Sequence, residues 1–301
     1  MRGQDVARLA LLAAIWGASF IFMRTLAPVL GPALTAFSRV TIAGLALVLY
    51  FRAAGFDAGL SRHWRAFAVI GVVSSALPFL LFSFAALHLP ASYSAILNSA
   101  TPLFAVLLSA LWLGEPLTLA RVAGLAAGMM GVGLVTGAGP AQPDAQFGLA
   151  VAAALAATLC YALSAIYVKR HAGGAKPMAI AGWSQVFAGV ALAPLLPFGP
   201  VAGPFTATVA ANVLALALLC SAAAYLLYFR LIADVGPSRT LTVTFLIPVF
   251  GMIWSALFLG ETITWPMLAG CALVIAGAYL VVRPAKGAGT AAGNASPGGG
   301  S

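Results

Sequence analysis

The chain is dominated by apolar stretches of about 20 residues, the length that an α-helix needs to cross the hydrocarbon core of a bilayer. Short segments rich in proline, glycine and charge separate these stretches. The apolar runs between the breaks predict ten transmembrane helices, at 6–27, 33–52, 65–87, 91–113, 118–137, 146–169, 177–198, 208–231, 237–259 and 265–283. We therefore expect an all-α integral membrane protein.

Composition supports a location in the bilayer. Of 301 residues, 62% are hydrophobic and 7% are charged, whereas an ordinary soluble domain carries about 25% charged residues. The first apolar run lacks a convincing cleavage site and leads into further spans, so we expect it to be retained rather than removed as a signal peptide. The Gly, Ala and Ser run at 284–301 is expected to form a disordered tail.

Basic residues are distributed unevenly along the predicted topology. With a cytoplasmic N-terminus, every Lys and Arg except Arg24 and Arg39 falls at a cytoplasmic helix end or loop. The positive-inside rule therefore predicts cytoplasmic N- and C-termini and a multi-pass protein of the bacterial inner membrane. Because basic loops face anionic lipid headgroups, the net charge of +9 gives little support to nucleic-acid binding.

One line of sequence occurs twice. "LWLGEPLTLARVAG" begins at Leu111 and "LFLGETITWPMLAG" begins at Leu257. A displacement of 146 positions places residues 102–135 over 248–281 without a gap, and 15 of the 34 pairs are identical. This predicts two five-helix repeats, 6–137 and 146–283. Five is odd, so the second repeat enters the membrane from the opposite side, which is the inverted-repeat plan of many secondary transporters.

Further motifs resemble a known family. "WGASF" (Trp16 to Phe20), "SRVTIAG" (Ser38 to Gly44) and the paired "LGEP" and "LGET" lines resemble the EamA-type carriers of the drug/metabolite transporter superfamily, over residues 6–283. The resemblance implies a ten-helix carrier that often exports amino acids or related metabolites. The second repeat departs from the pattern, with "CYALS" in place of "IWGAS" and Gln185 in place of Arg39. Whether the two halves contribute equally to a site stays open.

The two Gly-Glu motifs place Glu115 and Glu261 just ahead of predicted helices. A carboxylate there interacts favourably with the exposed N–H groups and positive end of the following helix. We expect a structural role that fixes the helix hairpin. The alternative is a direct role in binding substrate or protons.

Three prolines, Pro78, Pro102 and Pro248, fall within predicted helices. A proline removes a backbone N–H and kinks the helix, and transporter sites lie where helices are interrupted near the midplane. We therefore expect these prolines to act as hinges beside a substrate site.

Polar residues cluster one turn before Pro102. They are Asn98, Ser99 and Thr101, and Thr244 occupies the repeat position of Asn98. An unsatisfied polar group in hydrocarbon costs several kcal/mol, so these side chains need partners. Contact with a solute is one hypothesis, and a bond to a neighbouring helix is the other.

Other candidate site residues lie at comparable depth. Aromatic cavity walls are predicted at Phe79, Tyr161, Trp183 and Tyr225, with Gln185 on the same helix as Trp183. Arg39 is an ionisable group within a span, which is a functional candidate, and its guanidinium would suit a carboxylate held by two hydrogen bonds. The alternative is that Arg39 reaches the outer surface or ties two helices together.

Missing motifs narrow the mechanism. No acidic residue is predicted at the midplane, so a proton relay is disfavoured and facilitated diffusion or exchange is expected. No phosphate loop and no HExxH pair occur, so we predict neither an enzyme nor a cofactor or metal site. The expected partners are the lipid bilayer and a small solute, with function as a monomer. The alternatives are a drug-like or nucleotide-like solute and a proton-coupled antiporter.

Overall fold

The computed structural model describes residues 2–139, 144–199 and 201–282. Every regular element in these ranges is a helix. By length and composition, eight described helices could cross a membrane, and the apolar helix Val243–Leu259 is shorter. An all-α membrane protein is confirmed, while the count of ten spans stays a prediction. The predicted tail, 284–301, lies outside the described residues.

The first two predicted helices are joined in one element, α1 (Gly3–Ala53). Gly31 interrupts it with φ 76° and ψ 159°, a conformation that glycine adopts readily because it lacks a Cβ. Pro28 and Pro32 flank this kink, and each removes one backbone N–H from the helical ladder. The predicted pair 6–27 and 33–52 is therefore present as two arms of a bent helix.

The third and eighth predicted helices each contain a π-helical segment. Their elements are α2 (Leu60–Gly71), η1 (Val72–Ala76) and α3 (Leu77–His88), and α9 (Ala207–Leu214), η3 (Ala215–Ala223) and α10 (Ala224–Val235). Displaced by 146 positions, η1 falls within η3. Pro78 follows η1, but Ala224 stands at the equivalent place after η3. Proline alone therefore does not account for the two segments.

The predicted helices 91–113 and 237–259 each contain an interruption. The observed elements are α4 (Ala91–Asn98) and α5 (Thr101–Leu113), and α11 (Pro237–Thr240) and α12 (Val243–Leu259). Pro102 has no N–H to bond the Asn98 carbonyl, and the Thr101 hydroxyl donates to that carbonyl at 2.8 Å. Pro248 lies inside α12, after the second interruption.

The remaining elements are α6 (Leu119–Ala138), α7 (Ala145–His171), α8 (Pro177–Leu192), η2 (Ala193–Phe198) and α13 (Trp265–Val282). The predicted helix over 177–198 matches one continuous apolar helix, Pro177–Phe198, whose final part, η2, is a 3₁₀-helix. Pro194 and Pro197 lie in this segment, and neither supplies the N–H that an α-helical turn requires.

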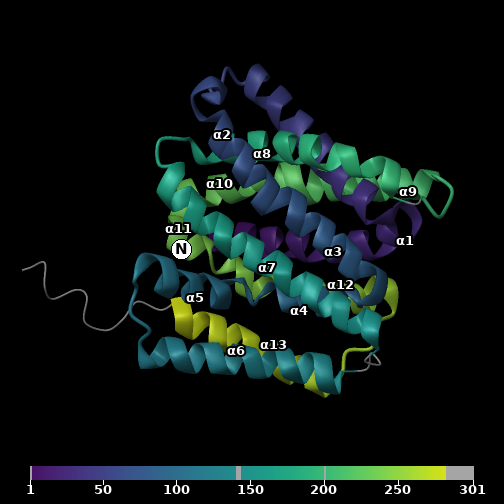
Figure 1. Cartoon of the computed structure of the whole chain (residues 1–301), viewed down its shortest axis with the longest axis vertical. Helices are drawn as coiled ribbons and strands as arrows, with labels where there is room; N and C mark the ends of the chain where they lie inside the picture. The colour runs from purple at the N-terminus through teal and green to yellow at the C-terminus, as the bar shows by residue number, and fades with distance from the viewer. Residues whose placement is uncertain (1, 140–143, 200, 283–301) are drawn as a thin grey trace, which may run out of the picture.

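Helices α6 and α13, each the last helix of its predicted repeat, lie side by side along one edge of the bundle (Figure 1). Glycines allow this approach. A Cβ added at Gly131 would lie 2.6 Å from the Gly270 carbonyl oxygen, and one added at Gly124 would lie 2.7 Å from the Gly277 carbonyl oxygen. Small residues therefore bring the two backbones into contact, as is common between membrane helices.

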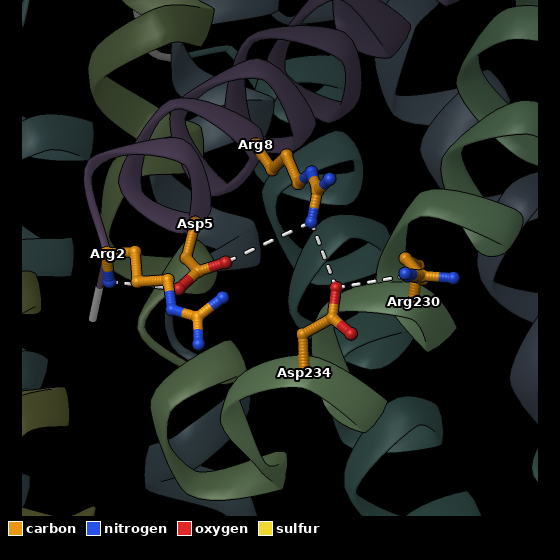
Figure 2. Close-up of polar contacts among 5 residues, drawn as sticks. All are labelled: Arg2, Asp5, Arg8, Arg230 and Asp234. Atoms are coloured by element: carbon orange, nitrogen blue, oxygen red, sulfur yellow. Dashed lines mark hydrogen bonds and ion pairs between the residues drawn. The ribbon is translucent and has the colours of Figure 1, made fainter.

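Charged residues tie the start of α1 to the end of α10 (Figure 2). Arg8 Nη1 lies 2.9 Å from Asp234 Oδ2, and Arg230 Nε lies 3.0 Å from the same oxygen. Asp5 accepts a hydrogen bond from the backbone N–H of Arg2 at 2.9 Å. The first and second predicted repeats are therefore linked at the end that holds the N-terminus.

Candidate functional site

Arg39 lies inside the protein, on the second arm of α1, with 5% of its surface exposed. Its Nε donates a hydrogen bond to Ser221 Oγ on η3 at 3.0 Å. The guanidinium carbon lies 3.8 Å from the centroid of the Phe79 ring, within the range of a cation–π interaction. This buried cation therefore contacts a hydroxyl and an aromatic face.

Gln185, on α8, is fully buried. Its Nε2 donates to Ser75 Oγ on η1 at 3.1 Å and to Tyr225 Oη on α10 at 3.3 Å. Within the described residues, Gln185 Oε1 has no hydrogen-bond partner, and neither does the buried Nε1 of Trp183. Helix α8 thus carries one unsatisfied acceptor and one unsatisfied donor two positions apart.

Residues at equivalent positions of the two sequence repeats make equivalent contacts. Arg39 and Gln185 are 146 positions apart, as are Ser75 and Ser221 and also Phe79 and Tyr225. Arg39 and Gln185 each bond the serine on the π-helical segment of the other repeat, and each contacts the aromatic residue of its own repeat. We call these six residues the cross-repeat cluster: Arg39, Ser75, Phe79, Gln185, Ser221 and Tyr225.

Sequence reasoning missed Ser75 and Ser221. The signal that would have found them is the 146-residue spacing that relates the other pairs. Ser221 Oγ also donates to the Leu216 carbonyl oxygen, five residues earlier in η3, at 3.2 Å. A hydroxyl that donates into its own helix leaves its oxygen free to accept from Arg39, and π-helical turns are frequent at functional sites.

Of the predicted site residues, Arg39, Phe79, Gln185 and Tyr225 meet in this cluster. Tyr161, on α7, packs against the apolar group that contains Phe79, and its ring stacks on Phe82 with centroids 6.4 Å apart.

The other predicted group lies at the helix interruptions. Ser99 is buried at the break between α4 and α5, and Asn98 is half-buried beside it. Thr101 donates to the Asn98 carbonyl, and Thr244 donates to the Leu241 carbonyl at 2.8 Å. These hydroxyls satisfy carbonyls within their own segments, as expected where proline or a break frees them.

Glu261 has a different partner from the one expected. Its carboxylate accepts hydrogen bonds from the Ala91 backbone N–H at 2.6 Å, the Ser92 backbone N–H at 3.0 Å and the Ser92 hydroxyl at 2.6 Å. These groups form the first turn of α4, in the other repeat, rather than the helix that follows Glu261. The charge therefore caps a helix N-terminus across the two repeats.

Glu115, its repeat mate, contacts basic side chains. Arg121 Nη2 lies 3.2 Å from Glu115 Oε2, and Lys169 Nζ lies 3.7 Å from Oε1. Arg121 belongs to the first turn of the following helix, so Glu115 joins α6 to the end of α7. Both glutamates therefore connect helices, Glu261 through the start of α4 and Glu115 through α6 and α7.

A cavity of about 460 Å³ lies beside Glu261 and away from the cross-repeat cluster. Its lining residues are Arg24, Thr25, Pro28, Leu87, Pro90, Leu259 and Glu261. The cavity therefore sits at one end of the bundle, next to the capped start of α4.

Comparison with known proteins agrees with this architecture. The chain is 28% identical over 282 residues to a "Probable terminal-alkyne amino-acid exporter" of Streptantibioticus cattleyicolor, covering 93% of each chain. It is 26% identical over 293 residues to the "Uncharacterized transporter YvbV" of Bacillus subtilis, covering 92% of this chain and 91% of the relative. It is 28% identical over 211 residues to a "Probable amino-acid metabolite efflux pump" of Salmonella typhimurium, covering 64% and 68%.

A solved crystal structure shares the fold. It matches 93% of this chain and 96% of its own, with a TM-score of 0.65 at 20% sequence identity. The model of the EamA-like transporter family matches residues 6–137 and 148–283. The chain therefore belongs to the EamA-like transporter family, and it is a multi-pass membrane secondary transporter rather than an enzyme.

Proposed function

We propose that this protein exports amino acids or related small metabolites by alternating access, between two inverted halves of five membrane spans each. The observation that carries the proposal is the cross-repeat cluster, in which equivalent residues of the two repeats bond each other's π-helical segments. A site between inverted repeats is reached from either side by rocking one repeat against the other. Two relatives are named as a probable terminal-alkyne amino-acid exporter and a probable amino-acid metabolite efflux pump, and these names support the solute class.

The substrate-binding residues in this proposal fall into two groups. The first comprises four members of the cross-repeat cluster, Arg39, Phe79, Gln185 and Tyr225, together with Tyr161 and Trp183. The second lies at the helix interruptions and comprises Asn98, Ser99, Thr101 and Thr244, with Pro78, Pro102 and Pro248 as hinges. A buried polar atom without a partner costs about 1–3 kcal/mol, and a bound solute would satisfy Gln185 Oε1 and Trp183 Nε1.

We propose uncoupled transport by a single chain with cytoplasmic termini. The six acidic residues of the chain all lie within the described ranges, and their carboxylates bond helix starts, a loop or basic side chains. None of them belongs to the cross-repeat cluster, so a carboxylate that carries protons through the site has no candidate there. Both repeats are contained in one chain, which supports function as a monomer.

The test is uptake of a panel of radiolabelled amino acids into proteoliposomes, with and without a pH gradient. Protein-free liposomes are the control. We expect saturable uptake of at least one neutral amino acid without a gradient. Uptake that requires the gradient would replace the uncoupled mechanism with proton antiport. Absence of uptake across the panel would contradict the amino-acid assignment.

A further inference from the structure

The two repeats match in position within the cross-repeat cluster but differ in charge. Arg39 carries a positive charge where its mate, Gln185, is neutral. The serines that they bond are the same residue type at equivalent places on η1 and η3. Any electrostatic preference of the cluster for a solute therefore comes from one residue, Arg39.

The charge of Arg39 is poorly compensated. Among the described residues, which include all six acidic ones, Arg39 forms no ion pair. Its guanidinium contacts the Ser221 hydroxyl, the Met23 sulfur at 3.6 Å and the Phe79 ring. A cation–π contact offsets only a small part of the free-energy cost of burying an ion. Arginine keeps its charge in proteins, so an anion is the group that would offset this cost.

The same surroundings limit the charge of that anion. The other members of the cluster are neutral hydroxyls, an amide and an aromatic ring, so one guanidinium matches one negative charge. A phosphate monoester carries about −1.5 to −2 charges at neutral pH, which is more negative charge than one guanidinium neutralises. A carboxylate fits better, because it is planar and accepts two parallel N–H bonds from a guanidinium.

We propose that Arg39 is the selectivity residue of this transporter and makes the site require a carboxylate on the solute, which it binds in place of Ser221. Ser221 keeps a partner when it is displaced, because its hydroxyl already donates to the Leu216 carbonyl. Gln185 Oε1 and Trp183 Nε1 are the neutral groups left for the rest of the solute. The inference rests on the proposed function in one respect, that the solute passes through this cluster.

The first test measures binding in detergent with the full chain and its Arg39→Gln variant. The probes are benzoate and benzamide, which have the same shape and differ in charge. We expect benzoate, and not benzamide, to raise the unfolding temperature of the unmodified protein, and we expect the variant to lose this effect. Equal stabilisation of the unmodified protein by both probes would overturn the proposal, even if the variant does not fold.

The second test compares transport of L-phenylalanine and L-phenylalaninamide in proteoliposomes. We expect the unmodified protein to show a KM at least about 10-fold lower for the carboxylate than for the amide. Arg39→Gln should bring this ratio close to one. The exchange variant Arg39→Gln/Gln185→Arg is the matched control, because it moves the charge to the mirror position and should restore part of the preference.

The outcomes separate the two proposals. If phenylalanine is transported and Arg39→Gln keeps the full preference for the carboxylate, the role of Arg39 is wrong and the proposed function stands. If no amino acid is transported but benzoate stabilises the unmodified protein and not Arg39→Gln, the amino-acid assignment fails and the carboxylate site stands.

Discussion

Glu261 Oε2 accepts two hydrogen bonds from Ser92, one from the backbone N–H at 3.0 Å and one from the hydroxyl at 2.6 Å. The two residues are 169 positions apart. Glu261 follows the C-terminus of α12, and Ser92 lies in the first turn of α4. Hydrogen bonds to an ionised acceptor are stronger than neutral ones, so this contact fixes the start of α4 against the other repeat.

Replacement of Glu261 should destabilise the protein through α4. Glu261→Ala leaves two backbone N–H groups of the first turn without an acceptor, and we expect a loss of about 1–3 kcal/mol in the free energy of unfolding. Ser92→Ala removes one of the three bonds and should cost about 1 kcal/mol. Denaturation in mixed micelles measures both. Thr262→Ala, at an exposed neighbour, is the control, and equal stability of Glu261→Ala and Thr262→Ala would contradict the capping role.

Glycines on α6 offer a matched pair of substitutions. A methyl group at Gly131 would meet the Gly270 carbonyl, whereas a Cβ at Gly133 would meet nothing within 4 Å. Gly131→Ala should force α6 and α13 apart and lower the free energy of unfolding by about 1–3 kcal/mol. Gly133→Ala should be neutral or stabilising by up to about 1 kcal/mol, because alanine favours helix. Thermal unfolding in detergent compares the two, and equal effects would argue against the close packing.

The inverted topology is tested by the sidedness of two equivalent loops. Pro116 and Thr262 are both exposed and lie 146 positions apart. Pro116→Cys should react with an impermeant maleimide from the cytoplasmic side only, and Thr262→Cys from the outer side only. The parent for both variants lacks the native cysteines Cys160, Cys220 and Cys271. Labelling of both positions from one side would rule out inverted repeats.

The ion pairs at the start of α1 should contribute little. Asp234 binds Arg8 and Arg230, and the side chains of these residues are 29%, 38% and 69% exposed. Exposed ion pairs are worth about 0–1 kcal/mol because water and salt screen them. We expect Asp234→Asn to change the free energy of unfolding by less than about 1 kcal/mol, with a smaller effect at high salt. A larger loss in both salt conditions would show that this contact holds the repeats together.

The all-α membrane fold could be predicted from the sequence because the apolar runs that indicate it are local features of the chain. Apolar runs mark the helices, and the 146-residue spacing pairs Arg39 with Gln185 and Phe79 with Tyr225. The same spacing pairs Ser75 with Ser221, but serine is common in helices and nothing local marks these two. Their role depends on whether the π-helical segments turn these serines toward the other repeat. Tertiary packing determines this orientation.

The contact of Glu261 with α4 could not be predicted for a similar reason. A glutamate just ahead of a helix indicates a cap, and the following helix is the nearest one in sequence. The partner is instead the start of α4, 169 positions away in the sequence. Pro102 indicated an interruption close to the break at Ser99, whereas the break at Leu241 lies seven positions before Pro248 and no proline marks it.

The π-helical turn at Val72–Ala76 also bears on how the chain tolerates changes in length. Such a turn holds one residue more than an α-helical turn, so deletion of a single residue there would yield a regular α-helix while α2 and α3 keep the faces that they now bury. A deletion within α13 would instead rotate every later side chain by about 100° around the helix axis. Natural length variation among relatives of this protein is thus expected to concentrate at that turn as well as in the loops.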